Sequence, residues 1–453
     1  MIKKFRYEVM CMGVLSSLSR QQKEAVGILQ IGTFLEYFDL MIYVHLAGFL
    51  NELFFPQTDP HATKLLLAFS FCLTFIFRPF GALFFGYIGD NFGRKLTIII
   101  TTMAMACCCI TMAILPTYSQ IGITAAWGIT ICRVVQGMSS MGEIVGASIY
   151  VTESIKKPAC YPAVSFFASA SCLGGFLALA IGSSVLTLGI SWRVVFLFGT
   201  IIAIVGTVAR TALRETPEFA NAKLELEKKL EKANMDSSLV FKTDPIVNEK
   251  VNQKTSLAFF LLESSHPVWF YFVYMHCGSI LKHTFNYSSH QIIQHNLILA
   301  AVSFFATLIY AYLSYFIYPL KILKVKLIIF SFVIFVPYLL FHITTVTQLL
   351  YMQIFICVFD LTSLPASAIL FTYFPIFKRF KYISFLYALA RAIMYIVVSF
   401  GLVYLVEKFN HWGLLIIFIP VIIGFNFGIS HFEKLEKEAE NYPKSTLKMV
   451  TAV

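Results

Sequence analysis

Long apolar runs separated by short polar loops occupy nearly the whole of this 453-residue chain. A helix of about 20 apolar residues is long enough to cross the hydrocarbon core of a bilayer. Such a segment forms a helix in lipid because each backbone polar group must find its partner within the protein. We therefore predict an all-α membrane protein with twelve transmembrane helices in two six-helix bundles. The runs cover 25–50, 64–89, 96–115, 121–150, 161–188, 193–212, 256–281, 292–318, 325–343, 346–373, 381–405 and 412–431.

The composition supports this class and excludes others. Charged residues make up 13% of the chain, about half of the roughly 25% that is usual in soluble domains. A soluble enzyme, a secreted disulfide scaffold and a disordered protein are therefore excluded. The ten cysteines include no CxxC pair, and most lie inside apolar runs. We interpret them as small buried apolar side chains, and we predict no metal site and no cofactor.

The basic residues gather in alternate loops, which predicts the orientation of the helices. Cytoplasmic loops carry an excess of Lys and Arg, so the net charge of +11 is a topology signal and predicts no nucleic-acid partner. Both termini and the central loop are expected in the cytoplasm, with the chain in a bacterial inner membrane. The basic loops between helices contain residues 94–95, 156–157, 321–326 and 378–381.

The runs divide the chain into five parts. We expect a cytoplasmic tail, an N-terminal bundle, a cytoplasmic central loop, a C-terminal bundle and a second cytoplasmic tail. Opposite charges lie three or four residues apart within 223–232, which favours a short exposed helix in the central loop. The expected parts are 1–24, 25–212, 213–255, 256–431 and 432–453.

A charged, glycine-containing turn follows the second run. Gly93 permits a tight turn, and Asp90 lies at a helix end where it can accept charge-assisted hydrogen bonds. The segment 86–95 resembles the G-x-x-x-D-x-x-G-R-K loop motif of the major facilitator superfamily. That resemblance implies a gate on the cytoplasmic side. Its expected residues are Gly86, Asp90, Gly93, Arg94 and Lys95.

Further segments are similar to the metabolite:proton symporter branch of that superfamily, which contains proline/betaine, 2-oxoglutarate, citrate and shikimate carriers. Two positions depart from the pattern: Met141 stands where the branch has glycine, and Tyr315 replaces the acidic residue of the second copy of the loop motif. The similar segments are 34–39, 54–56, 78–82, 133–137, 141–143, 192–193 and 214–219, with a weaker likeness at 373–380.

Ionisable residues within the runs are the main candidates for function, since each costs about 2.5–3.5 kcal/mol near the bilayer centre. Glu36 and Asp39 are three residues apart and share one helix face, so their carboxylates would repel and favour proton exchange. The alternative is a static pair of acids that an Arg neutralises. We expect proton coupling or substrate binding from Glu36, Asp39, Arg133, Gln136 and Glu143, although Glu143 could equally form a gate salt bridge.

The second half offers Glu263, Asp360 and Arg391 as secondary candidates. Asp360 and Arg391 lie on consecutive helices, and we expect them to neutralise each other. Arg78 and Arg210 lie near helix ends, where long basic side chains can snorkel to the interface.

The seventh run contains Pro267, which should kink its helix. Trp269, Tyr271 and Tyr274 follow it and offer aromatic faces to a quaternary ammonium group; packing or lipid contact is the alternative, which we favour. His266, His276 and His342 receive no ligand role. These three histidines are isolated in the sequence.

The resemblance implies a secondary active transporter that couples uptake of a small polar metabolite, a zwitterion or a carboxylate, to protons by alternating access. Its expected partners are that substrate, protons and the lipid bilayer. No Walker motif indicates ATP use, and we predict that the chain is not an enzyme. The alternative is a non-transporting membrane sensor that retains the fold. The oligomeric state is left open.

Overall fold

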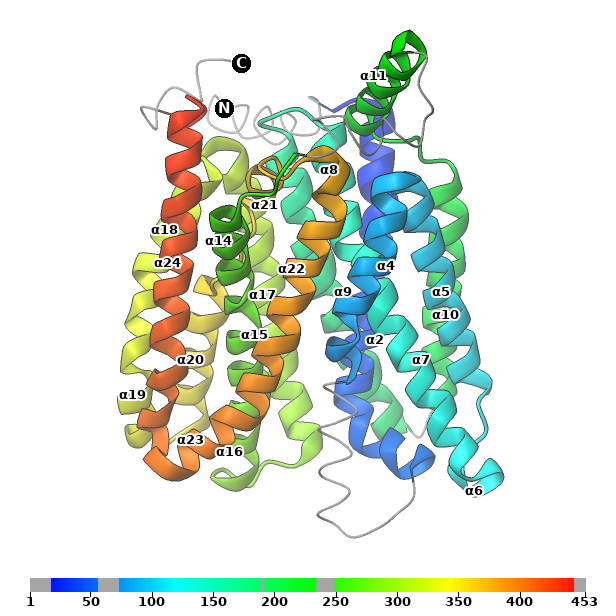
Figure 1. The fold of residues 1–453 in the computed structure, drawn as a ribbon. Coiled ribbons are helices and arrows are strands. Elements are labelled where there is room, and N and C mark those ends of the chain that lie inside the picture. Colours follow the sequence, from blue (N-terminus) through cyan, green and yellow to red (C-terminus); the bar gives the residue numbers. More distant parts are fainter. Residues whose placement is uncertain (1–17, 56–72, 189–190, 234–248, 444–453) are drawn as a thin grey trace, which may run out of the picture.

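The computed structural model describes residues 18–55, 73–188, 191–233 and 249–443. These ranges are helical and contain no β-strand. The helices stand side by side (Figure 1), and helix α2 (Arg20–Phe54) begins at the same end of the molecule at which helix α24 (Leu414–Glu438) finishes. We call this end the terminal end and the opposite one the far end.

The first half of the described chain forms six consecutive crossings, a crossing being one helix or a series of adjoining helices that runs between the two ends. Helix α11 follows them at the terminal end and confirms the expected exposed helix in the mixed-charge segment. The elements after α2 are α4 (Arg78–Asn91), α5 (Arg94–Ile114), α6 (Tyr118–Ile121), α7 (Ile123–Met141), η1 (Gly142–Gly146), α8 (Ala147–Ser154), α9 (Cys160–Leu188), α10 (Arg193–Thr211) and α11 (Pro217–Ala233).

The second half forms six more crossings, so the twelve predicted ones are confirmed. Seven continuous helical stretches in the described ranges are long and apolar enough to cross a membrane without interruption. The elements before α24 are α14 (Gln253–Glu263), α15 (Ser265–Phe270), η2 (Tyr271–His276), α16 (Cys277–His283), α17 (Ser289–Phe316), α18 (Pro319–Phe330), η3 (Ser331–Phe335), α19 (Val336–His342), α20 (Val346–Phe359), α21 (Ser367–Phe371), α22 (Ile376–Ile396), η4 (Val397–Gly401), α23 (Leu402–Phe409) and η5 (Asn410–Gly413).

Two crossings of the second half are broken inside the bundle. Helix α14 ends at Glu263 because Pro267, four residues on, has no N–H to bond the Glu263 carbonyl; the predicted kink is confirmed. The tenth crossing is broken between α20 and α21, where residues 360–366 are not helical. This second break was not predicted. Irregular backbone at membrane depth is tolerated where it is buried in protein or lines a cavity.

Close helix packing joins α4 and α7 in the first half. Gly137 on α7 faces the backbone of Thr74, and a Cβ at Gly137 would collide with the Thr74 carbonyl oxygen. Gly81 on α4 meets the backbone of Met138 in the same way. Small residues thus allow α4 and α7 to approach closely, as is usual between helices in membranes.

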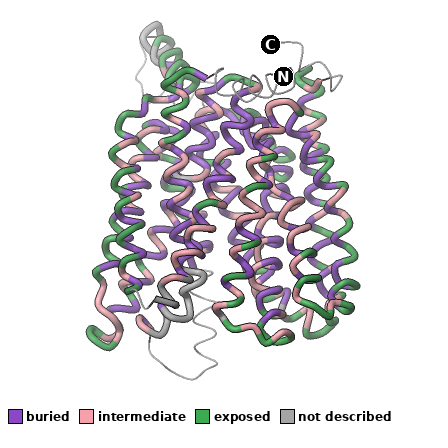
Figure 2. Tube along the Cα trace, turned by 180° about the vertical axis from the view of Figure 1, so that it is seen from behind, coloured by how far each residue is buried: buried purple, intermediate pink, exposed green. Residues whose placement is uncertain are grey.

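Apolar side chains cover the outside of the molecule. Figure 2 shows buried residues along the surfaces where helices meet and exposed residues along the outer surface. Large apolar side chains are exposed along the crossings, where lipid can cover them. They include Trp127, Ile131, Val208, Ile328, Phe332 and Tyr351.

Candidate functional site

At the terminal end, the loop motif of the first half is bound to the first turns of α22. The Asp90 carboxylate accepts hydrogen bonds from the backbone N–H groups of Phe380 (3.1 Å) and Lys381 (2.9 Å). The Arg94 guanidinium donates to the Ile376 carbonyl at 2.8 Å. Asp90 and Arg94 therefore hold backbone groups of the second half, in addition to their own contact at 3.3 Å.

Glu153 on α8 joins the same network. Its buried carboxylate accepts from Arg94 (3.2 Å) and from Arg379 on α22 (3.0 Å). Thr216 donates to it at 2.7 Å, and Arg379 also reaches Glu218 on α11 at 2.9 Å. We call Asp90, Arg94, Glu153, Glu218 and Arg379 the terminal-end network. Its ion pairs and hydrogen bonds hold the two halves together there.

The glycines of the motif permit this contact. A Cβ at Gly86 would press on the backbone of Lys381, and one at Gly89 would press on the Phe380 ring. Gly93 has a φ of 128°, which favours glycine, and the Glu215 carboxylate lies beside it. Glu215 accepts from the backbone N–H groups of Arg94 (3.0 Å) and Lys95 (3.3 Å) at the start of α5, where a helix favours negative charge.

The two acids of α2 bind different arginines. Asp39 accepts from Arg133 on α7 at 2.9 Å, and Arg133 also donates to Gln136 at 3.0 Å. Glu36 accepts from Arg78 on α4 at 3.0 Å. Each carboxylate is therefore neutralised by an arginine in this conformation, which relieves the expected repulsion between Glu36 and Asp39. This arrangement corresponds to the alternative of a static, neutralised pair of acids. The Glu143 side chain lies outside the described residues.

Arg78 and Arg210 do not snorkel, so that prediction is wrong. Both guanidinium groups are buried. Arg210 donates to the Thr102 hydroxyl and to the Leu29 carbonyl. Acceptors inside the protein bind both guanidinium groups, so neither side chain has to extend to the membrane interface.

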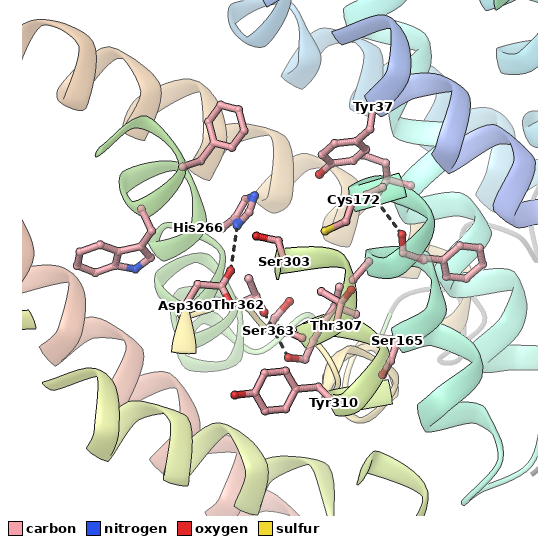
Figure 3. Close-up of a pocket in the computed structure, with 18 of the residues that line it drawn as sticks. Tyr37, Ser165, Cys172, His266, Ser303, Thr307, Tyr310, Asp360, Thr362 and Ser363 are labelled. Carbon is pink, nitrogen blue, oxygen red and sulfur yellow. Dashed lines mark hydrogen bonds and ion pairs between the residues drawn. The ribbon is translucent and has the colours of Figure 1, made fainter. Parts of the chain in front are cut away.

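A cavity of about 190 Å³ lies at the centre of the molecule, between the two halves. Side chains of α2, η1, α8 and α9 line it from the first half, and those of α14, α15, η2, α17, α18, α20, α21 and α22 from the second. The sequence candidates Glu36, Asp39, Arg133 and Gln136 are not among its lining residues. Its polar lining, shown in Figure 3, includes Tyr37, Ser165, Cys172, His266, Ser303, Thr307, Tyr310, Asp360, Thr362 and Ser363.

Two ion pairs of the second half line the cavity. Arg391 contacts Glu263 at 2.9 Å and stacks on the Tyr387 ring at 3.4 Å from its centroid. Asp360 accepts from Lys326 at 3.1 Å. The predicted pairing of Asp360 with Arg391 is therefore wrong. The break after α20 turns Asp360 toward α18, and α14 packs against α22 and brings Glu263 to Arg391.

Lys326 is a residue that sequence reasoning misplaced in a cytoplasmic loop. The predicted run 325–343 contains Lys326, but its charge also assigned it to the basic loop 321–326. Helix α18 begins at Pro319, six residues before that run, and only 4% of the Lys326 side chain is exposed. A helix places residues two apart on nearly opposite faces. Lys324 is 54% exposed and pairs with Glu433 at 3.1 Å, so the spacing of the two lysines was the available signal.

His266, to which the sequence assigned no role, lies beside Asp360. Its Nδ1 is 3.7 Å from the Asp360 carboxylate, which is longer than a hydrogen bond. Figure 3 shows the imidazole pointing toward Asp360. Trp269 lines the cavity too and packs on Phe330 and Phe418, with ring centroids 4.4 and 4.8 Å away. The aromatic residues after Pro267 thus contribute both packing and cavity wall.

Comparison with known proteins identifies relatives. Residues 29–430 match the sequence model of the Major Facilitator Superfamily. The proline/betaine transporter of Escherichia coli (strain K12) is 32% identical over 208 residues, which are 44% of this chain and 41% of that protein. The proline/betaine transporter of Salmonella typhimurium is 31% identical, with the same coverage of 44% and 41%. The matches span less than half of the length of these curated relatives.

Solved structures show the same fold. The proton:xylose symporter XylE of E. coli, bound to 6-bromo-6-deoxy-D-glucose, superposes with a TM-score of 0.71 at 16% identity and covers 94% of this chain and 97% of its own. The human organic anion transporter MFSD10 superposes with a TM-score of 0.67 at 14% identity, covering 90% and 100%. At these identities the likeness concerns the fold.

Proposed function

Because this chain belongs to the Major Facilitator Superfamily, we propose that it is a secondary active transporter that takes up a small polar metabolite together with protons. The substrate is a zwitterion or a carboxylate, the class to which proline and betaine belong. The chain acts as a multi-pass protein of the bacterial inner membrane, with the terminal end in the cytoplasm. It is not an enzyme.

The observation that carries this proposal is a central cavity between two halves that are bound together at one end. The terminal-end network joins Asp90, Arg94 and Glu153 of the first half to α22 of the second. Opening the cavity toward the terminal end requires these bonds to break. Alternation between this closed form and an open one would expose the site to each side in turn.

The acids of α2 are the proposed proton carriers. Asp39 is buried against Arg133, and Glu36 against Arg78. A proton on either carboxylate would weaken its pair with arginine and free that guanidinium to move. Gln136 keeps a hydrogen bond to Arg133, and Glu143 on η1 is assigned to the same coupling group by its place in the sequence. Movement of α2 against α4 and α7 would then follow protonation.

Transport is tested with the full chain in liposomes that contain a pH-sensitive dye. The external probes are proline, glycine betaine, 2-oxoglutarate, citrate and shikimate. We expect at least one carboxylate or zwitterion to acidify the interior, and Asp39→Asn to abolish the acidification. Uptake without acidification would contradict proton coupling. Absence of flux for every probe, from protein shown to be folded, would contradict the transporter assignment.

A further inference from the structure

The cavity contains two ion pairs that differ in access. Arg391 and Glu263 are 8% and 5% exposed, and the Tyr387 ring covers the guanidinium. Asp360 is 25% exposed and His266 27%, although Lys326 beside them is nearly covered. A ligand in the cavity can therefore contact Asp360 and His266, and it can reach the covered Lys326 ammonium only when Asp360 moves aside. Arg391 is enclosed by both Glu263 and the Tyr387 ring.

The Lys326 ammonium has the capacity to bond a second acceptor. Its ammonium has three N–H donors; one reaches Asp360, and the Tyr310 ring lies 4.5 Å away. Across the carboxylate, His266 Nδ1 is buried and has no hydrogen-bond partner among the described residues. A polar ligand or water is needed to satisfy this nitrogen. Two polar groups that flank Asp360 are thus incompletely bonded by the protein.

The break in the tenth crossing provides hydroxyl groups at the same place. Residues 360–366 leave the helix, and Thr362 and Ser363 line the cavity next to Asp360. Ser303 and Thr307 on α17 lie near them (Figure 3). In this conformation the hydroxyl groups of Thr362 and Thr307 donate to the carbonyl groups of Leu364 (3.3 Å) and Phe304 (2.8 Å). Rotation of a hydroxyl group would let it donate to a carboxylate that enters the cavity.

We propose that Lys326 is the binding group for the substrate carboxylate, and that Asp360 occupies this position as a competing anion when the cavity is empty. The incoming carboxylate displaces Asp360 from the ammonium, and Asp360 turns to His266 and the hydroxyl groups of the break. No covalent bond forms or breaks. This assignment rests on the proposed function for its substrate class, but it concerns residues of the second half alone.

If Asp360 competes with the substrate for Lys326, substitutions of the two residues should change the substrate affinity in opposite directions. Lys326→Gln should weaken binding of glycine betaine, measured by calorimetry on the detergent-solubilised full chain, by about 10- to 100-fold, the range for loss of a charge-assisted hydrogen bond. Asp360→Asn should strengthen binding by about 10-fold, because it removes the competing anion. A merely structural ion pair would give weaker binding in both variants. Any decrease in affinity in Asp360→Asn would overturn the proposal.

Matched controls isolate the ammonium and the carboxylate. Lys324→Gln removes the exposed lysine two residues away and should leave affinity within about twofold. Choline, which carries the same quaternary ammonium without a carboxylate, should bind equally to the wild-type chain and to Lys326→Gln. If Lys326→Gln does not fold, the double variant Lys326→Gln/Asp360→Asn, which carries neither charge, replaces it. Binding of glycine betaine by this double variant at wild-type affinity would overturn the assignment.

The experiment separates this proposal from the transporter assignment. Binding that depends on Lys326, with no flux in liposomes, would refute transport and keep the carboxylate site. Proton-coupled flux with an unchanged KM in Lys326→Gln would keep transport and refute the site. The assignment of a carboxylate site would be refuted if the folded wild-type chain bound none of proline, glycine betaine, 2-oxoglutarate, citrate and shikimate.

Discussion

Several buried charges of this molecule lie in contact with an opposite charge on another helix, whereas buried Arg210 bonds to a hydroxyl and a backbone carbonyl. Asp39 and Arg133 connect α2 to α7, and Glu263 and Arg391 connect α14 to α22. A charge that loses its partner in a low-dielectric interior costs about 3–5 kcal/mol, whereas the loss of both charges costs much less.

The pair on α2 gives a test of this asymmetry. We expect Arg133→Gln to lower the thermal unfolding midpoint in detergent by several degrees, because Asp39 is left buried without its cation. The double variant Asp39→Asn/Arg133→Gln should recover most of that loss. Equal destabilisation by the single and the double variants, measured by thermal denaturation followed by fluorescence, would show that the charge itself is not the cause.

Glycine at the α4–α7 contact is a second determinant of stability. Gly137→Ala should destabilise the protein by about 1–3 kcal/mol, because the new methyl group collides with the Thr74 backbone. Gly182 on α9 has no atom within 4 Å of an added Cβ. Gly182→Ala, measured in the same unfolding assay, should be neutral or stabilising through its higher helix propensity. Equal effects at the two sites would argue against tight α4–α7 packing.

Among the elements, α22 contacts both the cavity and the terminal end. Its first turns bind Asp90 and Arg94, and Arg391 further along it lines the cavity. A change at the cavity can therefore reach the terminal end through one helix. The broken crossings α14–α15 and α20–α21 also line the cavity and provide Glu263 and Asp360 to it.

Removing contacts between the terminal-end network and α22 should open the terminal end. Arg379→Ala removes the contacts to Glu153 and Glu218 and should raise the population with a long distance between spin labels at Tyr87 on α4 and Tyr382 on α22. Both label positions are exposed. Arg20→Ala, which breaks an exposed pair on α2 with little energetic value, is the control. An unchanged distance distribution in Arg379→Ala would show that Arg379 does not help to keep the terminal end closed.

The whole molecule presents its apolar outer surface to lipid. Ile131 lies exposed in the middle of α7, and Phe92 is exposed in the turn between α4 and α5. Ile131→Lys should reduce the yield of membrane-inserted protein, since a lysine near the bilayer centre costs about 2.5–3.5 kcal/mol. Phe92→Lys should have little effect, because the turn lies at the membrane surface. Equal yields, measured by membrane fractionation, would contradict this placement.

The positions of the crossings could be predicted from the chain alone, whereas the gate role expected of the loop motif came from its resemblance to a known family. An apolar segment of sufficient length forms a helix in lipid whatever its neighbours are, because its backbone bonds are internal. Within the described residues the predicted runs therefore lie close to the crossings: α18 begins six residues before its run, and α24 ends seven residues after its run. The beginning of the run 64–89 lies outside the described residues. The residues of the motif were found because their order along the chain is itself the signal.

The partners of the charges could not be predicted, because a pair depends on which helix faces meet across long stretches of sequence. Glu36 and Asp39 share a face, yet they bind Arg78 and Arg133 from different helices. Asp360 meets Lys326 instead of Arg391 because its crossing is interrupted and turns the carboxylate toward α18. Local apolarity thus places each helix in the membrane, whereas contacts between distant helices place Lys326, Asp360 and His266 around one cavity.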